Sequence, residues 1–282
     1  MKAPKAGSLD RRKIWATQMQ AGRMVRRVAE ALAPHVRVMP VKGVLLGRTF
    51  YDDLADRTLS DCDVVVVGAS ARDAAAMLVD RGFRVVRWSN DPNVVDLRHP
   101  DLPGMYLDVH ARPLPVGFGP VTSAWLAEGA REDATLFAAP VLIPDDRRLL
   151  VHLLGNIQRD HVFRAHAHTA EDVARVLARS PYAIDAFAEV IGEARLRVGS
   201  WSALRWVEAR TGSDRAAALC EALRLSAGER RWARARESVM RPAASVAPAP
   251  LLSRVVARCV SASPGPCAAA TSGRHGGARW SR

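Results

Sequence analysis

Two aspartates, Asp61 and Asp63, stand at the start of a run of valines in the segment DCDVVVV. Residues two apart on a strand face the same side, so both carboxylates point together while Cys62 points into the opposite layer. Like charges about 6–7 Å apart repel each other, which favours a cation between them. Mg²⁺ suits this pair because it takes carboxylate oxygens and shares substrate phosphates. The alternative is two solvated aspartates at the entry of a strand.

A third carboxylate follows in the later segment MYLDVH, where Asp108 shares a predicted strand face with His110. Two metal ions need more ligands than one aspartate pair, and Asp108 would bridge them or bind the second. Asp96 in VVDLRH competes for this role. Asp108 is preferred because its segment alternates polar and apolar residues more cleanly.

Candidate phosphate-binding residues lie upstream of the aspartate pair. Gly43 lets backbone amides approach a phosphate, and the helix predicted after it adds its positive end. Lys42 is one of four lysines in a chain with 37 arginines, and the other three lie within the first thirteen residues. This predicts a phosphate-facing ammonium, with a solvated loop lysine as the alternative. Arg57 either binds a triphosphate or pairs at the surface with Asp53 or Asp56.

Hydrophobic periodicity predicts an α/β first half and an all-helical second half. Six segments from residue 145 onward have helical spacing, and His152 and His161 are expected on a helix surface or in the core. The first half is expected to contain helices over 11–33, 44–54 and 71–82 and strands over 35–41, 61–67, 83–89, 93–99 and 105–113.

Charge and composition exclude several classes of protein. The net charge of +12 comes from the ends of the chain: residues 1–30 carry eight basic and two acidic residues, and residues 241–282 carry six arginines and no acid. The neutral remainder does not predict a nucleic-acid groove, so specific nucleic-acid binding is not expected. No apolar segment reaches the ~18 residues that cross a membrane, and no signal peptide is recognised. Four cysteines without metal-ligand spacing indicate reduced thiols, so a cytoplasmic location is expected.

The order of the motifs KG, YDDLADR, LSDCDVVVV and LDVHARP resembles that of the uncharacterised nucleotidyltransferase family of bacterial proteins, over residues 36–180. The resemblance implies an α+β fold, a small mixed sheet with helices, followed by an all-helical domain. It implies transfer of a nucleoside monophosphate from a nucleoside triphosphate (NTP), ATP by default. Asp61, Asp63 and Asp108 would then be catalytic carboxylates that bind Mg²⁺ or Mn²⁺. Lys42 and Gly43 would line the phosphate site. They stand in place of the Gly-Ser pair that is usual in the wider nucleotidyltransferase superfamily, which includes DNA polymerase beta.

We therefore expect an N-terminal amphipathic helix at 1–33, a catalytic domain at 34–143, a helical domain at 144–240 and a disordered basic tail at 241–282. The sequence does not identify the acceptor: a small molecule, a peptide, a protein side chain and an RNA end all stay open. One alternative is a non-catalytic or regulatory nucleotide-binding module of the same fold. Another is a ribonuclease with the Arg159–His166 motif, but chance alone gives about three such matches.

Overall fold

Strands and helices alternate through the first half of the computed structural model, which describes residues 8–115, 117–161 and 168–245. Almost every predicted element is present, with boundaries shifted by a few residues. The elements are α1 (Ser8–Leu32), β1 (Arg37–Pro40), α2 (Lys42–Thr49), the 3₁₀ helix η1 (Leu54–Asp56), β2 (Asp61–Val67), α3 (Ala71–Val79), β3 (Arg84–Trp88), β4 (Val94–Arg98), β5 (Tyr106–His110), α4 (Ser123–Ala127), β6 (Arg131–Asp133) and β7 (Val141–Ile143).

Five of these strands form one mixed sheet in the order β1-β2-β5-β4-β3, and β6 and β7 form a separate hairpin. β2 and β5 are parallel neighbours, while β1–β2, β4–β5 and β3–β4 are antiparallel. The parallel pair is reached by a crossover through α3, β3 and β4. Two strands distant in sequence are thereby placed side by side at the centre of the sheet.

The two faces of the sheet differ in composition because side chains alternate along each strand. Cys62, Val64 and Val66 of β2 lie in the main apolar core, together with residues of α1 and α3. On the opposite face, Val65 and Val67 join a small second cluster with α4 and β7. Asp61 and Asp63 lie on this second face, before the two valines. One end of that face is therefore apolar and the other is charged.

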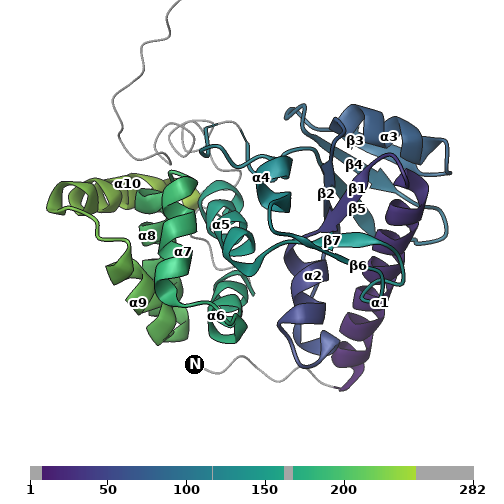
Figure 1. Ribbon diagram of the computed structural model, residues 1–282. Coiled ribbons are helices and arrows are strands. Elements are labelled where there is room, and N and C mark those ends of the chain that lie inside the picture. The colour runs from purple at the N-terminus through teal and green to yellow at the C-terminus, as the bar shows by residue number, and fades with distance from the viewer. Residues whose placement is uncertain (1–7, 116, 162–167, 246–282) are drawn as a thin grey trace, which may run out of the picture.

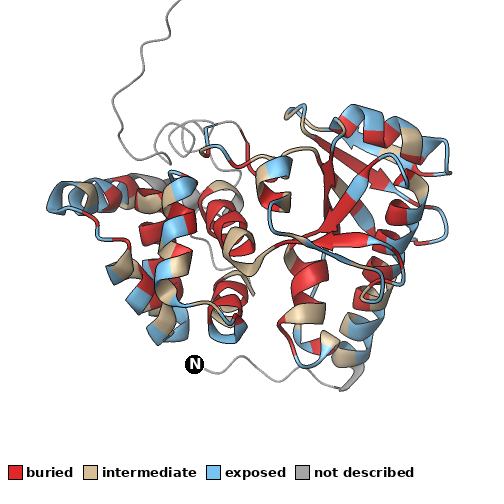
Figure 2. Cartoon of the chain, viewed as in Figure 1, coloured by how far each residue is buried: buried red, intermediate tan, exposed pale blue. Residues whose placement is uncertain are grey.

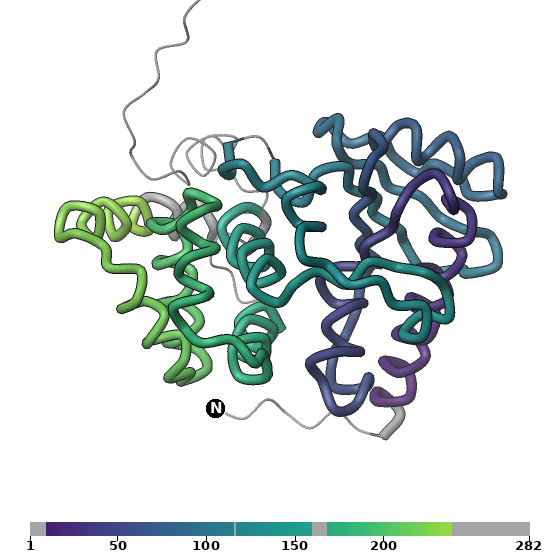
Figure 3. Tube along the Cα trace, in the orientation of Figure 1, coloured from purple at the N-terminus to yellow at the C-terminus, as the bar shows by residue number. Residues whose placement is uncertain are grey.

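The second half of the chain is helical, as predicted, and lies beside the sheet (Figures 1 and 3). Its first helix, α5, is buried over Leu149–Asn156 and lies between the other helices and the sheet (Figure 2). The elements are α5 (Asp146–Asn156), the π-helix η2 (Ile157–His161), α6 (Thr169–Arg179), α7 (Ile184–Glu193), α8 (Arg197–Thr211), α9 (Asp214–Ala222) and α10 (Ala227–Ser245).

The expected domain boundary between residues 143 and 144 stays a prediction. A single apolar core contains residues from both halves, such as Val64 and Phe187. Helix α10 continues to Ser245, past the expected boundary at 240. The rest of the predicted disordered tail lies outside the described residues, as do His166 of the ribonuclease motif and the side chain of His161. Among the described residues, no helix is long and apolar enough to cross a membrane.

Candidate active site

The strand register gathers carboxylates from three neighbouring strands at the charged end of the sheet. Asp63 of β2 lies opposite Asp108 of β5, and Asp108 lies opposite Asp96 of β4. The side chain of Asp96 forms an ion pair with Arg87 of β3, with the Arg87 Nη2 atom 2.7 Å from its Oδ2 atom. Asp96 therefore already has a cationic partner, whereas Asp63 and Asp108 face each other across neighbouring strands.

A third group completes a compact set of possible metal ligands. Ligand atoms of Asp63, Asp108 and His110 all lie within 4.8 Å of one another. Asp61, which the sequence placed in the metal site, is outside this set, and its Oδ1 atom accepts a hydrogen bond of 3.0 Å from Ser60. Asp61 lies on the same face of β2, two residues before Asp63. Its assignment as a metal ligand stays a prediction. Sequence reasoning placed His110 on the correct face without including it among the ligands.

The charge of Asp63 is held by two partners. Its Oδ1 atom accepts a hydrogen bond of 2.7 Å from the Lys42 ammonium and lies 3.1 Å from Nε2 of His110. The Asp63 side chain is only 5% exposed. Burial by itself would raise its pKa, but Lys42 and His110 keep the pKa well below its usual range. Asp63 is therefore an anion at any physiological pH.

The pKa values of the other two carboxylates, Asp61 and Asp108, are shifted upward instead. Burial, together with the negative charges of Asp63 and Asp61, raises the pKa of Asp108 to about 7. Burial and the charge of Asp63 also raise the pKa of Asp61. Each shift means that the free protein disfavours a further negative charge at this place. The cluster therefore binds either protons or a cation near neutral pH.

The donor set fits a hard divalent cation. Carboxylate oxygens are the usual ligands of Mg²⁺ and Mn²⁺, whereas an imidazole nitrogen is more typical of ions such as Zn²⁺. The buried Nδ1 atom of His110 has no hydrogen-bond partner among the described residues. Asp63, Asp108 and His110 could hold such an ion without a change in the strand register.

Lys42 and Gly43 are the first two residues of α2, rather than a turn that precedes the helix. Lys42, not the glycine, adopts the left-handed conformation, with φ 52°. A Cβ atom on Gly43 would overlap the side chain of Leu59 and crowd the Arg57 guanidinium. A larger residue at position 43 would therefore displace these two side chains, and a contact between the Gly43 backbone and phosphate stays a prediction.

Arg57 has a partner that neither sequence alternative contained. Its Nε and Nη2 atoms donate hydrogen bonds of 2.9 and 2.8 Å to Asp172 of α6, which also accepts one of 2.7 Å from the Tyr51 hydroxyl. Asp53 and Asp56, the surface partners considered from the sequence, pair with Arg11 instead. The guanidinium therefore joins the sheet half of the molecule to the helical half, and a role in triphosphate binding would require it to share this contact.

Helix α5 contributes buried polar groups that the sequence did not connect with the site. His152 is 1% exposed, and burial together with the positive charges of Lys42 and His110 lowers its pKa to about 3. Its Nδ1 atom has no hydrogen-bond partner among the described residues, nor do the amide atoms of Asn156 one turn later. From the sequence, a histidine in an apolar helix is equally consistent with an ordinary core residue. Only the three-dimensional packing could therefore show where His152 lies.

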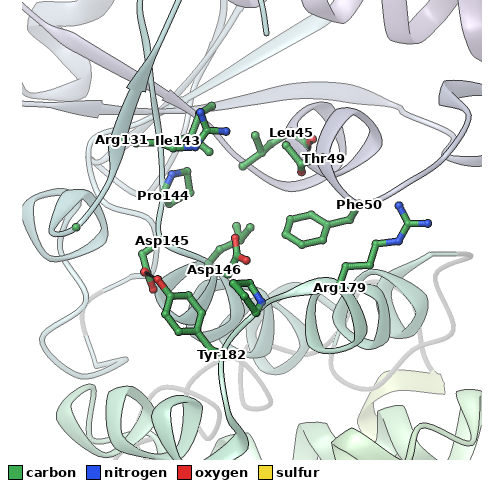
Figure 4. Close-up of a pocket in the computed structure, with 13 residues that line it drawn as sticks. Leu45, Thr49, Phe50, Arg131, Ile143, Pro144, Asp145, Asp146, Arg179 and Tyr182 are labelled. Carbon is green, nitrogen blue, oxygen red and sulfur yellow. Dashed lines mark hydrogen bonds between the residues drawn. The ribbon is translucent and has the colours of Figure 1, made fainter.

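A cavity of about 370 Å³ lies between the two halves near the start of α5 (Figure 4). It is bordered by Leu45 and Phe50 from the α2 region and by Asp145 and Tyr182 from the helical half. The Tyr182 hydroxyl donates a hydrogen bond of 2.6 Å to Asp145. None of the predicted metal carboxylates lines this cavity. It is therefore separate from the acidic cluster.

The model of the uncharacterised nucleotidyltransferase family matches residues 9–212, which include the whole sheet and most of the helical half. No curated protein matches the chain. The chain belongs to the uncharacterised nucleotidyltransferase family. It is accordingly a nucleotidyltransferase, and the sequence expectation of this family is confirmed.

Proposed function

We propose that this protein transfers a nucleoside monophosphate, by default AMP from ATP, to an acceptor in a reaction that depends on Mg²⁺ or Mn²⁺. The single observation that carries the proposal is the convergence of Asp63, Asp108 and His110 within 4.8 Å on two parallel strands. Family membership supports the reaction class, and the cluster supports this edge of the sheet as the proposed site.

The chemistry is an in-line displacement at the α-phosphorus. A new bond forms between the acceptor oxygen and this phosphorus, and the bond to the β-phosphate oxygen breaks to release pyrophosphate. Bound divalent cations would neutralise the charge of the phosphates and favour ionisation of the acceptor hydroxyl. The chain itself mainly positions the reacting groups, because phosphoryl-type transfer requires little covalent chemistry from side chains.

Residues in and around the cluster have distinct parts in this proposal. Asp63 provides a permanent anion and Asp61 lies beside it on the same strand face. Asp108 would bind a cation and help to take the proton of the acceptor hydroxyl. Lys42 would bind a phosphate through its ammonium. We assign Arg57 a positioning role, because two of its nitrogens are bound to Asp172.

The test uses NTPs labelled at either the α- or the γ-phosphate, incubated with the protein, a divalent cation and cell extract. The proposal predicts that label from the α-position enters an acceptor fraction, whose size identifies the acceptor class, and that the γ-label does not. Asp63→Asn should abolish the transfer while circular dichroism and thermal unfolding stay close to those of the parent. Nucleotide binding without transfer, over a panel of extracts and all four NTPs, would favour a regulatory module instead.

A further inference from the structure

The Lys42 ammonium lies within the group of atoms that would bind a metal. It is 2.7 Å from Oδ1 of Asp63, and it acts as a positive charge on Asp61 and Asp108 as well. One compact cation is thus shared among three carboxylates. A lysine suits this place better than an arginine, since an ammonium is a point charge whereas a guanidinium is a broad, flat fork.

The backbone fixes Lys42 in this position. The N–H group of Val41 donates a hydrogen bond of 3.1 Å to the carbonyl of Asp63, so the chain enters α2 beside that residue. The left-handed φ of 52° at Lys42 is uncommon for a residue with a side chain. Unfavourable backbone conformations of this kind are concentrated at functional sites.

The ion pair is also able to open. The Lys42 side chain is 24% exposed, whereas that of Asp63 is 5% exposed. The ammonium can therefore move toward solvent or toward a ligand while Asp63 stays in place. A second cation at Asp63 would lie close to the ammonium, and two positive charges a few ångströms apart repel each other strongly in a protein environment.

We propose that Lys42 is an exchangeable internal counter-ion, which occupies a cation position of the acidic cluster in the free protein and moves to the triphosphate when metal and nucleotide bind together. This inference rests on the proposed function. The exchange of Lys42 makes metal binding weak in the absence of nucleotide and strong in its presence, because only the nucleotide offers Lys42 a new anionic partner. By thermodynamic linkage, the metal strengthens nucleotide binding by the same factor.

The test measures Mn²⁺ affinity by electron paramagnetic resonance, with and without a non-hydrolysable ATP analogue, for the parent protein and three variants. Lys42→Met removes the charge, and Lys42→Asn removes it with a residue that tolerates the left-handed backbone. Both should bind Mn²⁺ at least about tenfold more tightly than the parent in the absence of nucleotide. Both should also lose most of the gain that the analogue produces. Lys42→Arg keeps the charge and should retain weak binding without nucleotide.

The outcomes separate this inference from the function on which it rests. Unchanged or weaker Mn²⁺ binding in both uncharged variants, with a parent protein that binds Mn²⁺ and the analogue, would overturn the role of Lys42 alone. A parent protein that binds no Mn²⁺ with or without the analogue would overturn the proposed function too. Because no turnover is measured, the result does not depend on knowing the acceptor.

Discussion

Burial and charge give chemically identical side chains different roles in this cluster. Asp63 and Asp108 lie opposite each other on neighbouring strands, yet their pKa values move in opposite directions. Lys42 and His110 bind Asp63 directly, whereas the pKa of Asp108 is controlled by burial and by the charge of Asp63. This difference allows one residue to act as a fixed anion and the other to exchange a proton near pH 7.

The buried histidine on α5 predicts a pH dependence of stability. The pKa of His152 is lowered to about 3 in the folded state, while an unfolded histidine titrates near 6.5. The unfolded state therefore binds an extra proton between these values, and the stability associated with neutral His152 is lost as the pH falls below about 6.5. Between pH 7 and pH 5 this lowers the free energy of unfolding by about 2 kcal/mol.

Urea denaturation of the parent and His152→Gln over this pH range measures the effect. The variant should lose less stability than the parent, by about that amount. His35→Gln, which changes an exposed histidine, should leave the slope unchanged and serves as the control. Parallel pH profiles for the parent and His152→Gln would contradict the prediction.

At the scale of elements, α6 is connected to the sheet half by one buried ion pair. Asp172 of α6 is 4% exposed and accepts hydrogen bonds from Arg57 and Tyr51. Its replacement by alanine would leave the Arg57 guanidinium buried without its counter-ion. We predict that Asp172→Ala lowers the free energy of unfolding by about 3 kcal/mol or more.

The control for this prediction is another ion pair between the same two parts of the molecule. Asp52 binds Arg179 of α6, but Asp52 is 79% exposed. Asp52→Ala should therefore have little effect in the same urea denaturation experiment, because exposed ion pairs contribute little to stability. Equal decreases in the free energy of unfolding of the two variants would show that burial of the Arg57–Asp172 pair does not increase its contribution to stability.

The alternation of residues along the strands explains how far the site could be predicted. DCDVVVV and MYLDVH each specify which residues share a face, so the sequence pairs Asp61 with Asp63 on one strand and Asp108 with His110 on the other. The parallel pairing of β2 with β5, which sets Asp63 against Asp108, depends on a crossover that no local pattern reveals. The choice of Asp172 as the partner of Arg57 depends on helix packing, since 115 residues separate them.

At the scale of the whole molecule, the two halves also meet through a loop on the sheet side. Gly119 has φ 63°, and a Cβ atom there would overlap the carbonyl oxygen of Ala194 at the end of α7. We predict that Gly119→Ala destabilises the protein strongly, because backbone cannot move aside as a flexible side chain can. Differential scanning calorimetry should show a lower unfolding temperature.

Gly104→Ala separates this contact from the cost of the backbone conformation. Gly104 has φ 85°, so alanine is unfavourable there too, but no atom lies within 4 Å of the added Cβ. Gly119→Ala should therefore lower the unfolding temperature by clearly more than Gly104→Ala. A smaller or equal decrease would mean that the Ala194 contact is easily relaxed.

The fold class followed from the sequence because the halves differ in periodicity: strand-like alternation and helical spacing both occur before residue 145, and only helical spacing follows it. The way the halves join did not follow. It depends on long-range contacts such as those of Gly119 with Ala194 and of Arg57 with Asp172. The acceptor depends on surfaces that no motif in the chain specifies.

The measurement that tests the central claim most directly is calorimetric titration of Mn²⁺ with a non-hydrolysable ATP analogue into two matched variants. Asp108→Asn and Asp96→Asn alter carboxylates that lie opposite each other on neighbouring strands, but only Asp108 belongs to the cluster with Asp63 and His110. The account predicts that Asp108→Asn weakens Mn²⁺ binding at least about tenfold, while Asp96→Asn binds like the parent. Unchanged affinity in a folded Asp108→Asn variant, or an equal loss in both, would contradict it.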